Sequence, residues 1–83
     1  MTDKERYIDD LRFVLQDETE YYTLVIKNDT IIVSSDYNGA EVILTIYGVG
    51  VVNINIIKYL PETAETLTYI THALDKVNKE YMV

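Results

Sequence analysis

Apolar residues at the start of the chain recur with the period of a helix. Between residues 7 and 15 they are spaced so that they share one stripe of a helix: Tyr7, Ile8, Leu11, Val14 and Leu15. Thr2 and Glu5 have the spacing of a capping box, in which each side chain accepts a hydrogen bond from a free backbone amide. The pattern predicts an amphipathic helix that runs from this box to about Gln16.

From residue 21 the hydrophobic period changes to two, which is typical of strands with one buried face. The alternation extends over four runs: 21–27, 30–37, 41–47 and 51–57. Turn-forming residues separate the runs: Asn28-Asp29, Asn38-Gly39 and Gly48-Val49-Gly50. The sequence therefore predicts four strands joined by short hairpins.

The turns determine which residues pair, because a slip of one residue reverses every side chain. Two-residue turns at Asn28-Asp29 and Asn38-Gly39 give these pairs: Ile26 with Ile31, Leu24 with Val33, Val33 with Leu44, Ile31 with Ile46, and Ser35 with Val42. A two-residue turn at Gly48-Val49 would bury Asn53 and Asn55. A three-residue loop over Gly48–Gly50 instead pairs Leu44 with Ile54 and Val42 with Ile56. We therefore predict the three-residue loop.

Leu60-Pro61-Glu62 precedes a second helical pattern that extends to Tyr81. Its apolar stripe contains Leu67, Ile70, Leu74, Val77 and Tyr81, flanked by Ala73, and its outer face contains Glu65, Tyr69, His72, Lys76 and Lys79. Two amphipathic helices must bury their stripes, and the aliphatic face of the sheet offers room for both. We predict one α+β domain over residues 1–83, a four-stranded antiparallel meander with both helices packed on one face.

Composition narrows the possible partners. The chain has 83 residues, with 14 acidic against 7 basic side chains and a net charge of −7. Binding to nucleic acid or to an anionic membrane requires a basic surface, so both are disfavoured, whereas a basic protein partner is favoured. The absence of cysteine excludes disulfides and cysteine-ligated metals. No apolar run is long enough to span a membrane, and Met1–Lys4 does not begin a signal peptide, so we expect a cytoplasmic protein.

Catalysis is not expected from the residues available. His72 is the only histidine and lies on a helix face, whereas Ser34 and Ser35 lie in a strand, and no spacing joins them into a nucleophile with its base. The acidic segment 17–20 lacks the spacing of a calcium loop. We therefore predict no enzymatic activity, no metal site and no cofactor.

Acidic residues, together with aromatic residues that fall outside the predicted core, indicate binding to another protein. Phe13, the only phenylalanine, falls opposite the apolar stripe of the first helix. The predicted hairpin places Asp36 opposite Glu41, either as solvated side chains or as a docking point for lysine or arginine. The chain also has 8 tyrosines, which are common at interfaces but also favoured in strands. The candidate partner-binding residues are Asp9, Asp10, Phe13, Asp17, Glu18, Glu20, Asp36, Tyr37 and Glu41.

The second face of the predicted sheet is mixed in character, neither clearly core nor clearly solvent-facing. Exposed β-branched patches commonly have a partner. The alternative hypothesis is therefore a structural or adaptor protein that forms a homodimer through this face. The candidate dimer-interface residues are Val25, Ile32, Ile43, Tyr47, Val51 and Ile57.

In its size, its acidic charge and its predicted helix–meander–helix order, the chain resembles small acidic inhibitors encoded by phages, such as anti-CRISPR proteins. The resemblance covers the general character of the whole chain and includes no shared motif, so no functional residue is carried over from it. It implies a viral inhibitor that occupies the basic, nucleic-acid-binding surface of a partner protein.

Overall fold

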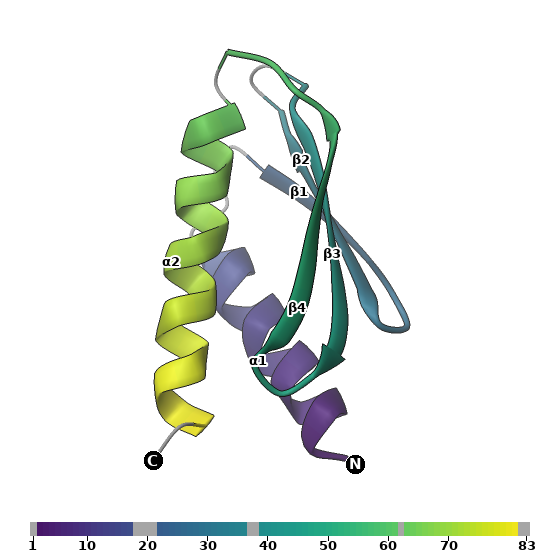
Figure 1. The fold of residues 1–83 in the computed structure, drawn as a ribbon, viewed down its shortest axis with the longest axis vertical. Coiled ribbons are helices and arrows are strands. Elements are labelled where there is room, and N and C mark those ends of the chain that lie inside the picture. The colour runs from purple at the N-terminus through teal and green to yellow at the C-terminus, as the bar shows by residue number, and fades with distance from the viewer. Residues whose placement is uncertain (1, 18–21, 37–38, 62, 82–83) are drawn as a thin grey trace.

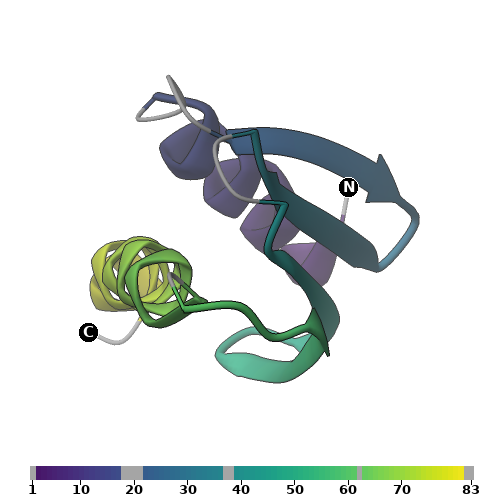
Figure 2. The same ribbon diagram turned by 90° about the horizontal axis from the view of Figure 1, so that it is seen from above.

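The computed structural model describes residues 2–17, 22–36, 39–61 and 63–81. Its elements are α1 (Asp3–Asp17), β1 (Tyr22–Lys27), β2 (Thr30–Ser35), β3 (Glu41–Gly48), β4 (Val51–Lys58) and α2 (Thr63–Tyr81). The strands form one antiparallel sheet in the order β1-β2-β3-β4, and both helices lie on the same side of it (Figures 1 and 2). The predicted α+β fold is confirmed.

Helix α1 begins with the predicted capping box. The Glu5 backbone N–H donates to Thr2 Oγ1 at 3.1 Å, and the Thr2 backbone N–H donates to Glu5 Oε1 at 3.4 Å. The helix continues to Asp17, one residue beyond the predicted end. Its buried residues are those of the predicted stripe, namely Tyr7, Ile8, Leu11 and Leu15, with Val14 partly buried beside them.

Removal of the Thr2 hydroxyl is expected to destabilise the protein moderately. The T2A variant should lose about 0.5–2 kcal/mol of unfolding free energy, because an amide of the first turn loses its acceptor. T2S keeps the hydroxyl and should stay within about 0.5 kcal/mol of the wild type. Urea denaturation of the three proteins measures both differences. Equal losses in T2A and T2S would show that the cap is not the stabilising group.

The pairing of β1 with β2 is as predicted. Ile26 lies opposite Ile31, and Leu24 lies opposite Val33. In the connecting turn Asn28 has a φ of 51°, a left-handed conformation that asparagine tolerates better than most residues.

The pairing of β2 with β3 differs from the prediction by two residues. Ile31 lies opposite Leu44 rather than Ile46, and Val33 lies opposite Val42 rather than Leu44. The Ser35 N–H donates to the Ala40 carbonyl at 2.8 Å, so four residues separate the last paired positions. The predicted two-residue turn at Asn38-Gly39, of which Asn38 lies outside the described residues, is therefore wrong. Because the shift is an even number of residues, the same side chains still face the core.

The pairing of β3 with β4 is confirmed, but the loop differs from the prediction. Leu44 lies opposite Ile54 and Val42 opposite Ile56, as predicted. Gly48 pairs with Val51, so the connecting turn contains only two residues, and a bulge between Ile46 and Gly48 accommodates the extra residue. Asn53 and Asn55 stay on the solvent side of the sheet, as required for an apolar core.

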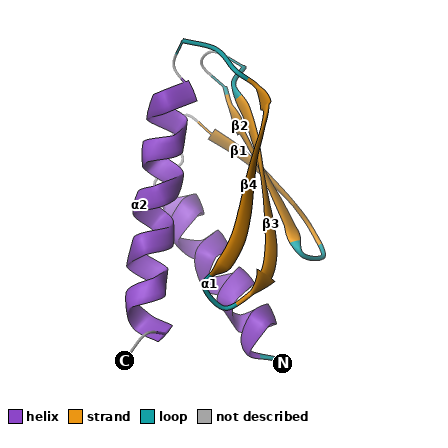
Figure 3. Ribbon diagram, viewed as in Figure 1, coloured by secondary structure: helices purple, strands orange, loops and turns teal. Residues whose placement is uncertain are grey.

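Helix α2 begins at Thr63, after Pro61. The Leu60 N–H donates to Thr63 Oγ1 at 2.7 Å, and the Thr63 N–H donates to the Leu60 carbonyl at 2.9 Å. The buried stripe is rotated relative to the prediction and consists of Thr63, Thr66, Ile70, Ala73 and Val77. Leu67, Leu74 and Tyr81 lie at its edges and are only partly buried. Figure 3 shows α2 running antiparallel to α1.

The core is centred on β2 and β3 and does not extend fully to β4. Ile31, Val33, Val42, Leu44 and Ile46 are completely buried. By contrast, Ile54 and Ile56 on β4 are 37% and 38% exposed. Ile54 and Ile56 therefore lie on the predicted core face of the sheet, but they are not buried as predicted.

Candidate protein-binding surface

Phe13 stands on the solvent side of α1 and is 71% exposed. Asp9 and Asp17 lie one turn before and one turn after it on the same helix face, and both are exposed. Arg12 Nη2 lies 3.5 Å from Asp9 Oδ1, but the pair is about half exposed and adds little to stability. We call Asp9, Phe13 and Asp17 the α1 outer surface, an aromatic side chain between two carboxylates.

Asp10 takes part in the contact between the helices. Its carboxylate accepts a hydrogen bond from the Tyr81 hydroxyl at 2.5 Å. The Tyr81 ring meets the Tyr7 ring edge to face, with 5.4 Å between the ring centroids, and the Tyr7 hydroxyl donates to Asn78 Oδ1. The structure therefore gives Asp10 a role in holding α1 against α2, which the sequence pattern did not suggest.

The hydrogen bond to Asp10, together with burial and the negative charge of Asp10, raises the pKa of Tyr81 to about 12. The protonated phenol is thus favoured in the folded state. Its contribution to stability is present below the ordinary pKa of 10.0 and is lost as the pH rises from there towards 12. D10N should move the Tyr81 pKa back towards its ordinary value, as measured by NMR titration with Y81F for assignment. An unchanged Tyr81 pKa in D10N would contradict this cause.

Asp36 and Glu41 do not face each other. Glu41 lies opposite Ser34 on one side and Lys58 on the other. Asp36 is exposed and accepts a hydrogen bond from Thr23 Oγ1 at 2.6 Å. The predicted carboxylate pair is wrong because the β2–β3 turn is longer than two residues.

Three further candidates, Glu18, Glu20 and Tyr37, lie outside the residues that the structure describes.

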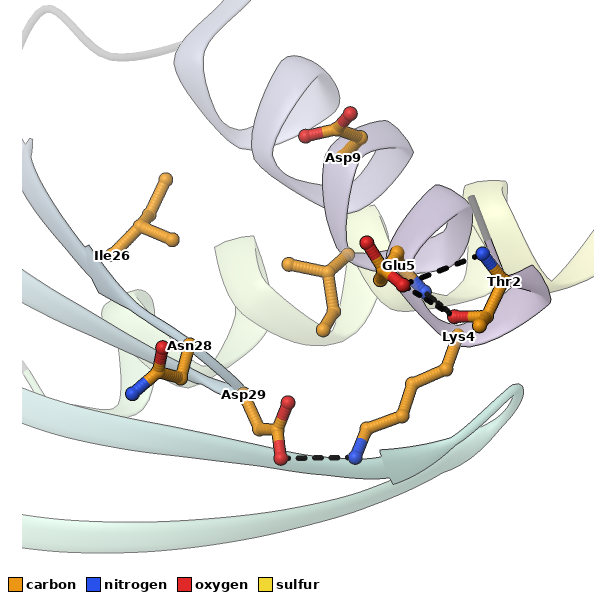
Figure 4. A pocket seen from close by; sticks show the side chains of 8 residues that line it. Thr2, Lys4, Glu5, Asp9, Ile26, Asn28 and Asp29 are labelled. Carbon is orange, nitrogen blue, oxygen red and sulfur yellow. Dashed lines mark hydrogen bonds and ion pairs between the residues drawn. The ribbon is translucent and has the colours of Figure 1, made fainter.

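An open pocket of about 560 Å³ lies between the first turns of α1 and the β1–β2 turn (Figure 4). Lys4 Nζ donates to Asp29 Oδ2 at 2.9 Å, which connects the helix with the turn. The lining also includes Thr2, Glu5, Ile8, Asp9, Ile26 and Asn28. Asp9 therefore belongs both to the pocket and to the α1 outer surface. From the sequence, Asn28-Asp29 indicates only a turn, so the pocket beside it could not be predicted.

The tyrosines divide into structural and exposed groups. Tyr69, predicted on the outer face of α2, instead stacks on Tyr22, with ring centroids 4.3 Å apart, and its hydroxyl donates to the Leu15 carbonyl. That prediction for Tyr69 is wrong, because the buried stripe of α2 is rotated towards it. Tyr47 and Tyr59 are 64% and 72% exposed.

The outer face of the sheet lies opposite the helices (Figure 2). Of the six candidate dimer-interface residues, Val25, Tyr47, Val51 and Ile57 are exposed, whereas Ile32 and Ile43 are partly buried between their neighbours. Thr23, Thr45 and Asn53 lie among them, so the apolar surface is interrupted by polar side chains.

Chemically reactive side chains are scattered in the described part of the chain. His72 is exposed on α2, and Ser34 and Ser35 lie in β2. Within residues 2–17, 22–36, 39–61 and 63–81, no His, Asp and Glu side chains gather in a group that could hold a metal ion. Neither of the described helices has the length and apolar composition to cross a membrane.

Comparisons of the chain with family models, with curated proteins and with solved structures give no match.

Proposed function

We propose that the protein binds a basic partner protein through the α1 outer surface and inhibits it by covering a cationic, nucleic-acid-binding surface. The observation that carries this proposal is the exposure of Phe13, at 71%, between two exposed carboxylates. Burial of a phenylalanine side chain stabilises by about 1.5–3 kcal/mol, and this protein leaves that free energy unused within its own fold. Aromatic anchors surrounded by complementary charge are typical of binding hot spots.

The pocket beside the α1 outer surface can accommodate a basic side chain of the partner. Glu5, Asp9 and Asp29 contribute carboxylates, whereas Lys4 contributes the cation of the lining. Ile8 and Ile26 offer apolar contact for the aliphatic part of a lysine or arginine side chain. In the proposed complex Phe13 enters an apolar depression of the partner while a basic side chain of the partner enters this pocket.

The net charge and the general character of the chain specify the class of partner. A charge of −7 complements a basic groove and speeds encounter with it, while it opposes direct binding to nucleic acid. With the resemblance to phage-encoded inhibitors, this favours a cytoplasmic anti-CRISPR protein whose partner is a CRISPR effector. Binding then requires no catalytic step and no cofactor.

The proposal is tested with purified CRISPR effectors, by calorimetry for binding and by DNA cleavage for inhibition. F13A should weaken binding about tenfold or more, and D9K/D17K should weaken it further, because charge reversal adds repulsion. E65K/E80K is the matched control, because it changes the net charge by the same amount at exposed positions of α2. Equal effects of the two double variants, or cleavage unaffected by the wild-type protein, would contradict the proposal.

A homodimer formed through the outer sheet face is the second candidate, in a structural or adaptor role. The exposure of Val25, Tyr47, Val51 and Ile57 favours it. V25K places a charge in the middle of that face and should dissociate such a dimer, as measured by light scattering over a concentration series. A wild-type protein that is monomeric throughout the series would contradict this role.

A further inference from the structure

Strand β4 stands at one edge of the sheet, and from Val52 to Ile56 it lacks the features that usually protect an edge. Edge strands present a row of backbone N–H and C=O groups to solvent and are commonly blunted by charged residues or proline. The segment from Val51 to Ile57 contains neither. The β3–β4 pair contains two bulges: Tyr47 is the extra residue on β3, and Ile57 is the extra residue on β4, near the end of that strand. The edge of β4 is therefore open to pairing over the regular segment from Val52 to Ile56.

Both faces of β4 are also incompletely covered. On the helix side Ile54 and Ile56 are 37% and 38% exposed, although their partners on β3 are fully buried. On the outer side Val51 and Ile57 are more than half exposed. An added strand would cover apolar side chains on both faces at once, which a contact with one face alone would not do.

The sequence of β4 is chemically symmetric about Ile54. In a two-fold, antiparallel pair centred on this residue, Ile54 lies opposite Ile54 of a second copy. Within the regular segment the flanking positions then match type with type: Asn53 with Asn55, and Val52 with Ile56. The β3–β4 ladder is regular from Val52 to Ile56, so this part of the edge has the extended geometry that pairing requires. The other edge, β1, matches less well, because a pair centred on Leu24 places Thr23 opposite Val25, and a pair centred on Val25 places Thr23 opposite Lys27.

The charge distribution favours a second copy at this place. Two chains that each carry a net charge of −7 repel each other, and the repulsion is smallest where the touching surfaces have no acidic residue. The segment 51–57 is uncharged, and the next residue along β4 is Lys58. A two-fold contact brings the same surface of both copies together, so that surface must be self-complementary. The uncharged segment of β4 meets this requirement.

We propose that two copies of the chain pair antiparallel through β4, in the register centred on Ile54, so that one sheet continues through both. The contact is an edge-to-edge pairing of residues 52–56 and differs from the outer-face dimer, whose candidate residues all lie outside this segment. It is independent of partner binding through Phe13. A single strand pair buries less than the roughly 1,600 Å² of a standard interface, so we expect a dissociation constant in the micromolar range or weaker.

The test is sedimentation velocity of the wild-type protein from micromolar to millimolar concentration, with two double variants of the exposed residues Asn53 and Asn55. N53K/N55K brings lysines opposite each other across the two-fold axis and should weaken the dimer about tenfold or more. It also lowers the net negative charge, so a loss of dimer cannot come from overall repulsion. N53K/N55E brings each lysine opposite a glutamate and should dimerise at least as tightly as the wild type at low salt.

Circular dichroism shows whether both variants remain folded, as expected for substitutions at exposed positions. A wild-type chain that stays monomeric throughout the series overturns the proposal. Equal weakening in N53K/N55K and N53K/N55E overturns the register centred on Ile54. A dimer that V25K disrupts and N53K/N55K does not would assign the contact to the outer face instead.

Discussion

The I31A variant is expected to lose about 2–5 kcal/mol of unfolding free energy, whereas I57A should lose less than about 1 kcal/mol. Ile31 is completely buried in β2, where it lies opposite Ile26 on one side and Leu44 on the other. Truncation there removes apolar contacts and leaves a cavity that the neighbouring strands cannot close. Ile57 is 52% exposed on the edge strand, so the same truncation at this position creates no enclosed space.

Urea denaturation of both variants and the wild type measures this difference. Domains of this size are only marginally stable, and a total of about 5–15 kcal/mol is typical of folded proteins in general. I31A should therefore show a clearly lowered denaturation midpoint with a similar slope. A loss in I57A as large as that in I31A would mean that β4 is covered in solution.

Introduction of a charge at Ala73 is expected to be at least as damaging. Ala73 is 2% exposed in the core face of α2. In A73E the carboxylate must either lose its hydration or force the helix away from the core, and an uncompensated buried charge costs about 3–5 kcal/mol. We therefore expect A73E to be largely unfolded at room temperature, with a weak helical signal in circular dichroism.

A64E is the matched control because it makes the same change on the same helix at an exposed position. Ala64 lies in the first turn of α2, where the helix dipole favours a negative charge, so A64E should be neutral or slightly stabilising. If A64E were destabilised as strongly as A73E, helix propensity rather than burial would be the cause. If neither variant were destabilised, α2 would not be packed against the core.

The order and faces of the elements could be predicted from sequence because the hydrophobic period changes clearly along the chain. The side chains assigned to the core face of each strand occupy that face in the structure, including Val33 and Leu44. The β2–β3 pairing was predicted two residues out of register, because the Asn38-Gly39 signal favours a short turn and says nothing about competing hydrogen bonds such as that from Ser35 to Ala40. The alternation of apolar and polar residues determines which side chains face the core, whereas the length of the turn determines which residues of the two strands pair.

The candidate surface was predictable only in part. The exposure of Phe13 follows from helical geometry, since its position lies opposite the apolar stripe. The pocket brings α1 together with the β1–β2 turn, and the hydrogen bond between Lys4 and Asp29 joins residues 25 positions apart, for which a local pattern has no signal. The bond of Asp10 to Tyr81 spans 71 positions for the same reason. Polar contacts between residues far apart in the sequence therefore could not be predicted from the sequence and are known only from the structure.

The hydroxyl groups of Tyr7, Tyr69 and Tyr81 each join one helix to the other. Since α1 and α2 run antiparallel, the start of α1 and the end of α2 lie at the same end of the molecule (Figure 1), and the three bonds follow one another along the contact between the helices. A mechanical pull on the two termini would load the bonds of Tyr81 and Tyr7 first and that of Tyr69 only after they had broken. The hydrogen bonds between the helices would thus break one after another, and the helices would separate at a lower force than if all three bonds carried the load together.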